Sequence, residues 1–266
     1  MKTLMAIGGA MDKEDAAIMH EFIRRAGGPS ARIVILPQAS MLADTGEIYV
    51  KQCLDLGAGA AISLEFRKHS QAGTSAQQEA IRDATGIFLT GGAQMRISAI
   101  MGGTAVEREL HAAYQRGCII GGTSAGASIL SKTMIAYGKG GPTPREGIVQ
   151  FSPGLGFTDK YIFDQHFRQR DRLGRLIYAV AAYPGALGVG LDENTAAIVE
   201  DDASITIFGT GGVTLVDGQQ MEYTDIADIE NRRPVAVSNL TIHILTHGST
   251  YKNGKVNIPE KMSLAE

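Results

Sequence analysis

Short apolar runs alternate with segments of helical periodicity over the first 120 residues, and no other feature constrains the fold as much. Helical spacing of apolar side chains lies at 13–26, around 48–54 and around 106–114. The apolar runs lie at 4–7, 32–36, 61–64, 86–90 and 118–120. This alternation predicts βαβ units and a mostly parallel sheet flanked by helices.

The second half of the chain shows closely spaced short strands with turns rich in Gly or Asp. These strands are predicted at 187–191, 196–199, 204–208, 213–216 and 241–245. Their spacing indicates antiparallel strands added to the parallel core. Because no linker rich in Pro or Ser, no repeat and no charge block interrupts the chain, we expect one α/β domain over residues 1–266.

The composition excludes several classes of protein. Hydrophobic residues make up 44% and charged residues 20% of the chain, which is too apolar for a disordered protein. A net charge of −3 argues against a nucleic-acid partner or an acidic membrane surface. Two cysteines, Cys53 and Cys118, are too few for a disulfide framework or a Cys-based zinc site. Without a membrane span or a signal-peptide pattern, we expect a cytoplasmic protein.

The pentapeptide Gly122–Gly126 fits the pattern G-x-S-x-G and makes Ser124 a candidate nucleophile. An apolar strand precedes it and a helix can begin directly after it, which is the context of a nucleophile elbow. A helix N-terminus behind the serine also favours a developing oxyanion. The alternative interpretation is a glycine-rich turn that packs closely or holds a phosphate.

A catalytic serine needs a base, and His166 is the best placed of the six histidines. It follows a short apolar strand, so it would meet a serine at the same sheet edge, although a histidine on a solvated basic helix is the simpler interpretation. Asp164 and Glu193 are candidates to orient it. Arginines at 168, 170, 172 and 175 follow; they form either a solvated face or a site for carboxylates.

Four separated segments together resemble one family, the cyanophycinases, which belong to a serine peptidase family that also holds peptidase E. The matching segments are GGAQ (91–94), GGTSAGAS (121–128), DQHFRQRDRLGRL (164–176) and GLDENTA (190–196). The resemblance implies a flavodoxin-like fold similar to the class I glutamine amidotransferases, and a homodimer. It also implies hydrolysis of cyanophycin, a poly-aspartate with arginine on each β-carboxylate, to β-aspartyl-arginine dipeptides, without metal or cofactor.

Carried over residue by residue, the resemblance makes Ser124 the nucleophile, His166 the base and Glu193 its acidic partner. It places substrate contacts at Gln94, Asp164, Gln165, Arg170, Arg172 and Arg175. We expect the oxyanion to meet backbone N–H groups of Ala125 and of the loop at Gly92. Two departures affect these assignments. In the loop 138–146, where some members carry an acidic residue, only Glu146 is acidic, which leaves the acidic partner open among Glu193, Glu146 and Asp164. Ala93 stands where an acidic residue is common.

Three other functions are compatible with parts of this pattern. A peptidase E-like aspartyl dipeptidase would share the elbow but not the arginine-rich segment after His166. An amidotransferase would use a cysteine in place of Ser124, and Cys118 lies six residues earlier, within the strand. A binding module that kept the scaffold without catalysis is the third alternative, since a fold alone does not imply an activity.

Overall fold

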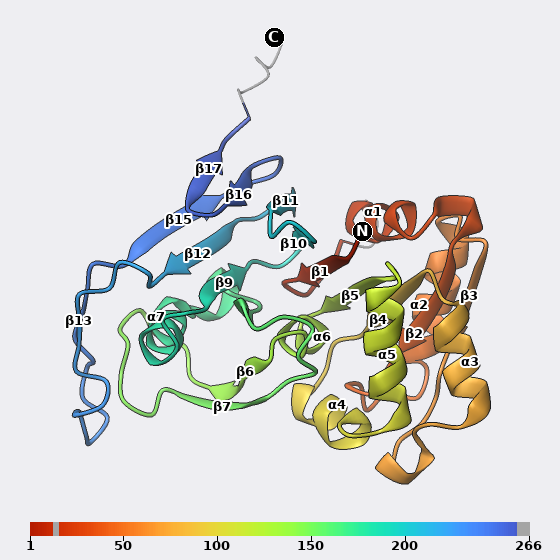
Figure 1. Cartoon of the computed structure of the whole chain (residues 1–266), viewed down its shortest axis with the longest axis horizontal. Helices are drawn as coiled ribbons and strands as arrows, with labels where there is room; N and C mark the ends of the chain where they lie inside the picture. The colour runs from red at the N-terminus through yellow and green to blue at the C-terminus, as the bar shows by residue number, and fades with distance from the viewer. Residues whose placement is uncertain (13–15, 260–266) are drawn as a thin grey trace.

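The computed structural model describes residues 1–12 and 16–259 and shows a nine-stranded mixed sheet at its centre (Figure 1). Five parallel strands form one half of this sheet, in the spatial order β1-β5-β4-β2-β3. They are β1 (Thr3–Ile7), β2 (Arg32–Leu36), β3 (Ala60–Ser63), β4 (Gly86–Leu89) and β5 (Ile119–Thr123). Each of these predicted strands is confirmed, with ends that differ by one residue at most except in β5, which ends three residues later than predicted.

Helices cover both faces of the parallel strands, which explains why these strands are continuously apolar. Alternate residues of β1 point to opposite faces: Met5 and Ile7 pack with α1 (Ala17–Arg25) and α2 (Thr45–Asp55), whereas Leu4 and Ala6 pack on the other side. That side is covered by α3 (Ser75–Asp83), α4 (Gln94–Met101) and α5 (Ala105–Gln115). The first residues of the helix predicted at 13–26, 13–15, lie outside the described residues.

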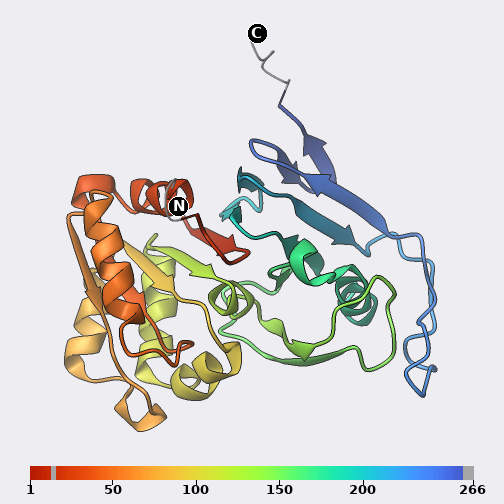
Figure 2. The same ribbon diagram turned by 180° about the vertical axis from the view of Figure 1, so that it is seen from behind.

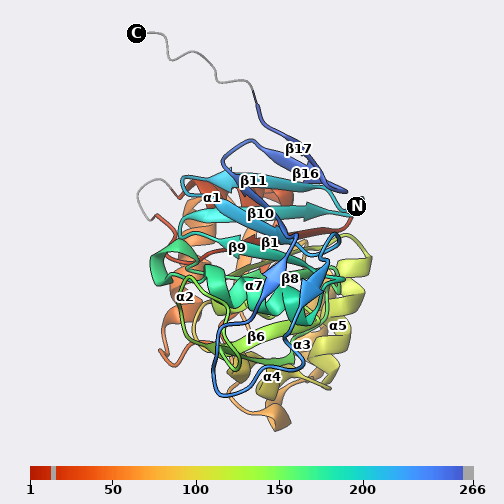
Figure 3. The ribbon, with the colours of Figure 1, turned by 90° about the vertical axis from the view of Figure 1, so that its left-hand side faces the viewer.

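Antiparallel strands extend the sheet beyond β1. In spatial order they are β10 (Thr195–Glu200), β11 (Ile205–Gly209), β16 (Thr250–Lys252) and β17 (Lys255–Asn257), stacked in Figure 3. The predicted antiparallel character of the second half is therefore confirmed. Only two of the five strands predicted there join the core sheet.

The other three predicted strands form a second sheet with a strand from the middle of the chain. Its order is β15 (Thr241–Leu245), β12 (Val213–Asp217), β9 (Leu187–Leu191) and β8 (Tyr161–Asp164), with β8 and β9 parallel. α7 (Leu173–Ala182) packs on this second sheet (Figure 2), where its Leu176 and Val180 side chains lie against the backbone at Gly188. Val189, Leu191 and Val213 join the same buried cluster as the core sheet.

Two hairpins were not predicted from the sequence. β6 (Thr133–Gly138) and β7 (Val149–Pro153) pair antiparallel with a register shift between Ile135 and Tyr137, and β13 (Tyr223–Thr224) pairs with β14 (Val237–Ser238). No helix within residues 1–12 and 16–259 has both the length and the apolar character needed to cross a membrane. Whether the chain folds as one cooperative domain stays a prediction.

Candidate active site

Ser124 lies on a strained turn between β5 and the short helix α6 (Ala125–Ser128). Its φ of 53° and ψ of −113° are rare for a residue with a side chain, and such strain is stored at functional sites. Glycines permit the turn: a Cβ at Gly122 would lie 2.1 Å from the Gly126 oxygen, and one at Gly126 would lie 2.1 Å from the Leu89 oxygen. The strand, elbow and helix predicted from G-x-S-x-G are therefore present.

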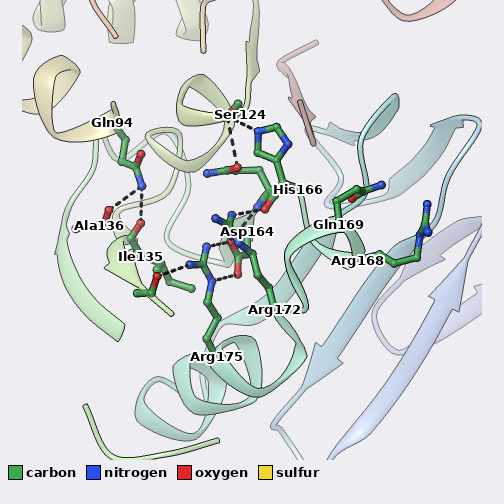
Figure 4. Close-up of polar contacts among 12 residues, drawn as sticks. Gln94, Ser124, Ile135, Ala136, Asp164, His166, Arg168, Gln169, Arg172 and Arg175 are labelled. Carbon is green, nitrogen blue, oxygen red and sulfur yellow. Dashed lines mark hydrogen bonds and ion pairs between the residues drawn. The ribbon is translucent and has the colours of Figure 1, made fainter. Parts of the chain in front are cut away.

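A chain of hydrogen bonds joins Ser124, His166 and Glu193. The Ser124 Oγ lies 2.9 Å from His166 Nε2 (Figure 4), and His166 Nδ1 lies 2.6 Å from Glu193 Oε1. His166 follows β8 and Glu193 follows β9. Because these strands are parallel neighbours, with Asp164 opposite Gly190, both side chains leave the second sheet at the same edge.

The two other acidic candidates lie elsewhere. Glu146 Oε2 accepts a hydrogen bond from Arg232 N at 3.1 Å, and the carboxylate of Asp164 pairs with Arg172 and Arg175. Of the three carboxylates left open by the sequence, Glu193 is the one that the structure places against His166.

The turn after β1 joins the segments that carry the three residues, and sequence reasoning missed this. Three consecutive carbonyls accept one hydrogen bond each: Ile7 O from Ser124 N at 2.9 Å, Gly8 O from His166 N at 2.7 Å and Gly9 O from Asn194 N at 2.9 Å. The approach is too close for any side chain. A Cβ at Gly9, where φ is +104°, would lie 2.4 Å from the His166 ring, and one at Gly8 would lie 2.0 Å from the Asp192 oxygen. Gly8 and Gly9 directly follow the apolar run 4–7, and no local pattern in the sequence indicates these contacts.

Asp192 and Gln169 hold the turn that carries Glu193. Asp192 accepts hydrogen bonds from Arg168 N at 3.0 Å and from Gly212 N at 3.1 Å, which ties this turn to the segment after His166 and to β12. Gln169 Oε1 accepts a hydrogen bond from Glu193 N at 3.2 Å; Gln169 and Arg168 are drawn in Figure 4. Asp192 and Gln169 were not singled out from the sequence, because the residues that they contact are distant in the chain.

Burial lowers the pKa of His166 below its ordinary value of 6.5. The hydrogen bond to Glu193 acts in the opposite direction, and the positive charges of Arg170 and Arg172 lower the pKa further. The imidazole is therefore neutral at pH 7. With Nδ1 bonded to a carboxylate and hence protonated, Nε2 is left as the acceptor that faces the Ser124 hydroxyl.

The backbone at Ala125 and at Gly91 lies next to Ser124, in the region where we predict the oxyanion site. Ala125 is the first residue of α6, so its N–H has no acceptor within the helix. The loop at Gly91 and Gly92 lies against the nucleophile, since a Cβ at Gly91 would be 3.4 Å from the Ser124 Cβ. Gly92 is also required by packing, because a Cβ there would lie 2.2 Å from the Ala39 oxygen.

The six residues assigned to the substrate fall into two groups. In the first group a polar side chain remains available to a substrate; its members are Gln94, Gln165 and Arg170. Gln94 Nε2 donates to the carbonyls of Ile135 and Ala136 at 3.0 and 2.8 Å, and Gln165 Oε1 lies 3.4 Å from the Ser124 Oγ. Arg170 is exposed and has no carboxylate partner among the described residues.

Asp164, Arg172 and Arg175 form a buried cluster instead. Arg175 is 4% exposed and grips Asp164 with two nitrogens, Nε at 2.6 Å and Nη2 (Figure 4). Arg172 Nη1 reaches Asp164 at 3.3 Å and also donates to the Gln165 carbonyl. Burial lowers the pKa of Arg172 to about 10, so it stays charged at neutral pH. The sequence had suggested that these two guanidinium groups face substrate; in the structure they face Asp164.

A pocket of about 330 Å³ opens at Ser124 between the turn after β1 and helix α2. Three of its lining residues, Gly91, Thr123 and Ser124, belong to segments already connected with the site. The other six come from segments that the sequence did not connect with it: Ala10, Met11, Thr45, Ile48, Tyr49 and Gln52. Cys118 is not a competing nucleophile, since burial raises the pKa of its thiol to about 12. The described part of the chain contains no group of three or more His, Cys, Asp or Glu side chains placed to hold a metal.

Comparisons with known proteins find similar sequences and a similar fold. The model of peptidase family S51 matches residues 4–207. The chain is 39% identical to a cyanophycinase of Synechococcus elongatus over 251 residues, 93% of this chain and 78% of that protein. It is 38% identical to a cyanophycinase of Geminocystis herdmanii over 97% of this chain and 95% of that protein. A solved peptidase from an acI-B1 Actinobacterium shares the fold, with 19% identity, a TM-score of 0.68 and coverage of 94% and 96% of the two chains.

Proposed function

Because this chain belongs to peptidase family S51, we propose that it is a cyanophycinase, a serine-type exopeptidase that cleaves the poly-aspartate backbone of cyanophycin to β-aspartyl-arginine dipeptides. The hydrogen-bonded series Ser124–His166–Glu193 is the observation that carries this proposal. A nucleophile, a base and an orienting carboxylate in contact are the elements of acyl transfer through a covalent intermediate.

The reaction begins when Ser124 Oγ attacks the backbone carbonyl carbon of a β-arginylated aspartate and its proton passes to His166 Nε2. The carbonyl oxygen becomes an oxyanion, which the N–H groups of Gly92 and Ala125 stabilise; such donors contribute roughly 3–4 kcal/mol each. His166 then protonates the leaving amine, and the C–N bond breaks. Water, deprotonated by His166, hydrolyses the acyl-enzyme and regenerates Ser124.

Glu193 keeps the Nδ1–H tautomer of His166 and stabilises the imidazolium that forms during each step. Because burial lowers the pKa of His166, the charged imidazolium is unfavourable in the free enzyme and returns its proton readily. The base is therefore ready at neutral pH.

The substrate roles follow from which polar groups remain available. Gln94 donates to β6 through Nε2, so its Oε1 is free to accept from a substrate amide. Arg170 supplies a guanidinium for a substrate carboxylate. The buried cluster of Asp164, Arg172 and Arg175 positions Gln165. Asp164 Oδ1 accepts a hydrogen bond from Gln165 N at 2.9 Å, and Arg172 donates one to the Gln165 carbonyl. They fix the residue whose side chain contacts Ser124.

The test is to incubate the protein and its Ser124→Ala variant with insoluble cyanophycin, and to follow clearing and products by mass spectrometry. We expect release of β-aspartyl-arginine by the unmodified protein and at least a 10⁴-fold lower rate for the variant, as for other serine triads. Cleavage of an α-aspartyl dipeptide in place of the polymer would overturn the proposal in favour of a peptidase E-like activity.

The homodimer expected from the resemblance is part of the same proposal. β15 is an edge strand of the second sheet, and its Ile242 and Ile244 are 43% and 71% exposed. An exposed apolar edge of this kind favours pairing with another copy. Sedimentation velocity should give twice the mass of 28.2 kDa, and Ile244→Lys should shift the protein toward the monomer.

A further inference from the structure

A second hollow, which we call the distal pocket, lies at the end of the β6–β7 hairpin. It has a volume of about 510 Å³ and is lined by residues 137–140, residues 145–150 and Arg232. Three cationic side chains line it, those of Lys139, Arg145 and Arg232, against one carboxylate, that of Glu146. With three cations against one carboxylate, the pocket carries an excess of positive charge. Glu146 Oε2 accepts a hydrogen bond from the Arg232 backbone N–H, which leaves its charge and its other oxygen available.

Unpaired arginines are unusual in this protein, and they gather here. Among the arginines of residues 1–12 and 16–259, only Arg145, Arg170 and Arg232 have a guanidinium group with neither a hydrogen bond nor an ion pair. Arg170 belongs to the active site, and the other two line the distal pocket. An anion bound in the pocket would supply these guanidinium groups with the partner that they lack within the described residues.

The backbone connects the distal pocket to the active site. The Gly138 carbonyl, on the pocket wall, lies 3.4 Å from Arg175 Nη1, and Arg175 grips Asp164 beside the catalytic serine. Gly141 N donates to Asp171 O at 2.5 Å, and Gly174 N donates to Gly141 O at 2.9 Å. A Cβ at Gly140 would lie 2.2 Å from the Arg170 oxygen. The loop therefore lies against the segment that carries the active-site arginines.

Hydrogen bonds to a second loop hold the distal pocket in shape. Glu146 N donates to Arg233 O at 3.1 Å, Val235 N donates to Pro144 O at 2.9 Å, and Arg145 forms a bridge with Pro234. All of these contacts use the backbone of residue 145 or its neighbours. The Lys139 and Arg145 side chains contribute nothing to them, so their charges are available to a ligand.

We infer that the distal pocket binds the arginyl branch of a further unit of the polymer while another unit occupies the active site. This inference rests on the proposed function. Arginine joined through its α-amino group keeps a free α-carboxylate, the anion that Lys139, Arg145 and Arg232 are suited to bind. The same branch carries a guanidinium, for which Glu146 is the available carboxylate. Successive branches are at most about 3.5 Å apart along an extended backbone, so a long substrate offers several of them.

The experiment compares two substrates with the double variant Lys139→Ala/Arg145→Ala. One is cyanophycin, and the other is a synthetic two-unit β-aspartyl-arginine peptide, which contains a single cleavable backbone bond and offers no unit beyond the two that flank this bond. We expect kcat/KM for the polymer, relative to that for the two-unit peptide, to fall about fivefold to tenfold, mainly through KM. Arg108→Ala, which removes a cation from α5, is the matched control and should leave this ratio unchanged.

An unchanged ratio in the double variant would overturn the inference, and so would an equal loss on both substrates. Thermal unfolding of the double variant checks that its fold is intact. The variant Lys139→Ala/Arg145→Lys, which keeps a positive charge at position 145, should have most of the polymer activity that Lys139→Ala/Arg145→Ala loses. If the unmodified protein cleaves neither substrate, the proposed function itself fails. That outcome differs from cleavage of both substrates with no effect of the variant.

Discussion

The two sides of the active site are built differently. Ser124 comes from the parallel sheet, on a turn fixed by glycines within five residues of it, Gly122 and Gly126. His166 and Glu193 come from the second sheet, on turns that depend on contacts with distant segments such as Gly8 and Gly9. The nucleophile is therefore positioned locally, and the base with its carboxylate is positioned by tertiary packing. Changes in the second sheet should reduce activity by misplacing the base rather than by removing a reactive group.

The largest effect expected on this second side comes from Glu193→Gln. The amide keeps the size of the side chain but loses the charge that stabilises the imidazolium and fixes its tautomer, so kcat should fall by about 10³ to 10⁴. Glu146→Gln should leave kcat on the two-unit peptide almost unchanged, because the Glu146 carboxylate bonds to Arg232 and not to His166. Steady-state kinetics of both variants decides between the two carboxylates. Equal losses would contradict the assignment.

Asp164→Asn should have the next largest effect, and it should act on stability. This change leaves Arg175, which is 4% exposed, and Arg172 without their carboxylate. Breaking a buried ion pair by removing one partner costs about 3–5 kcal/mol. Arg168→Ala, which removes an ion pair whose arginine is 76% exposed, should cost less than about 1 kcal/mol. Urea denaturation of the two variants measures the free energy of unfolding of each. Similar losses would show that the buried cluster of Asp164, Arg172 and Arg175 does not stabilise the fold.

Gly9→Ala tests the junction between the two sides. A Cβ at this position would push on the His166 ring, so we expect kcat to fall by about a hundredfold. Gly57→Ala is the control, because Gly57 has a similar positive φ of +90° with no atom within 4 Å of the added Cβ. Both variants should lose about 1 kcal/mol of stability from backbone strain, and the contact with His166 should add a further loss in Gly9→Ala. If their activities match, contact between Gly9 and His166 does not position the base.

The smallest effect concerns pH. Since only the neutral imidazole accepts the Ser124 proton, activity should fall as the pH decreases through the pKa of His166, which lies below 6.5. Arg170→Gln removes a positive charge that lowers this pKa, so the acid limb of the kcat/KM profile, which reports the free enzyme, should move to higher pH by a few tenths of a unit. A shift to lower pH would contradict the sign of this interaction.

Much of the first side could be predicted from the sequence, because it depends on local patterns. Apolar runs and helical spacing located β1 to β5, and G-x-S-x-G located the elbow at Ser124. The position of His166 at a strand end and of Glu193 between two strands was also readable from the sequence.

Contacts between distant segments could not be read in the same way. The hydrogen bonds of Gly8 and Gly9 join residues more than 150 positions apart, and no local pattern specifies them. The arginines after His166 looked alike in the sequence, yet the fold buries Arg172 and Arg175 on Asp164 and leaves Arg170 exposed. The hairpin of β6 and β7 was missed because its strands pair across a register shift and a loop of ten residues, 139–148.

Site-resolved labelling with a fluorophosphonate tests the central claim most directly, because the reagent reacts with a serine only when a base activates it. Peptide mapping of the unmodified protein should find the adduct on Ser124, and His166→Ala should slow the labelling by at least about a hundredfold. Gly9→Ala should slow it as well, whereas Gly57→Ala should not. An adduct on another residue, or labelling of Ser124 at the same rate without His166, would contradict the account.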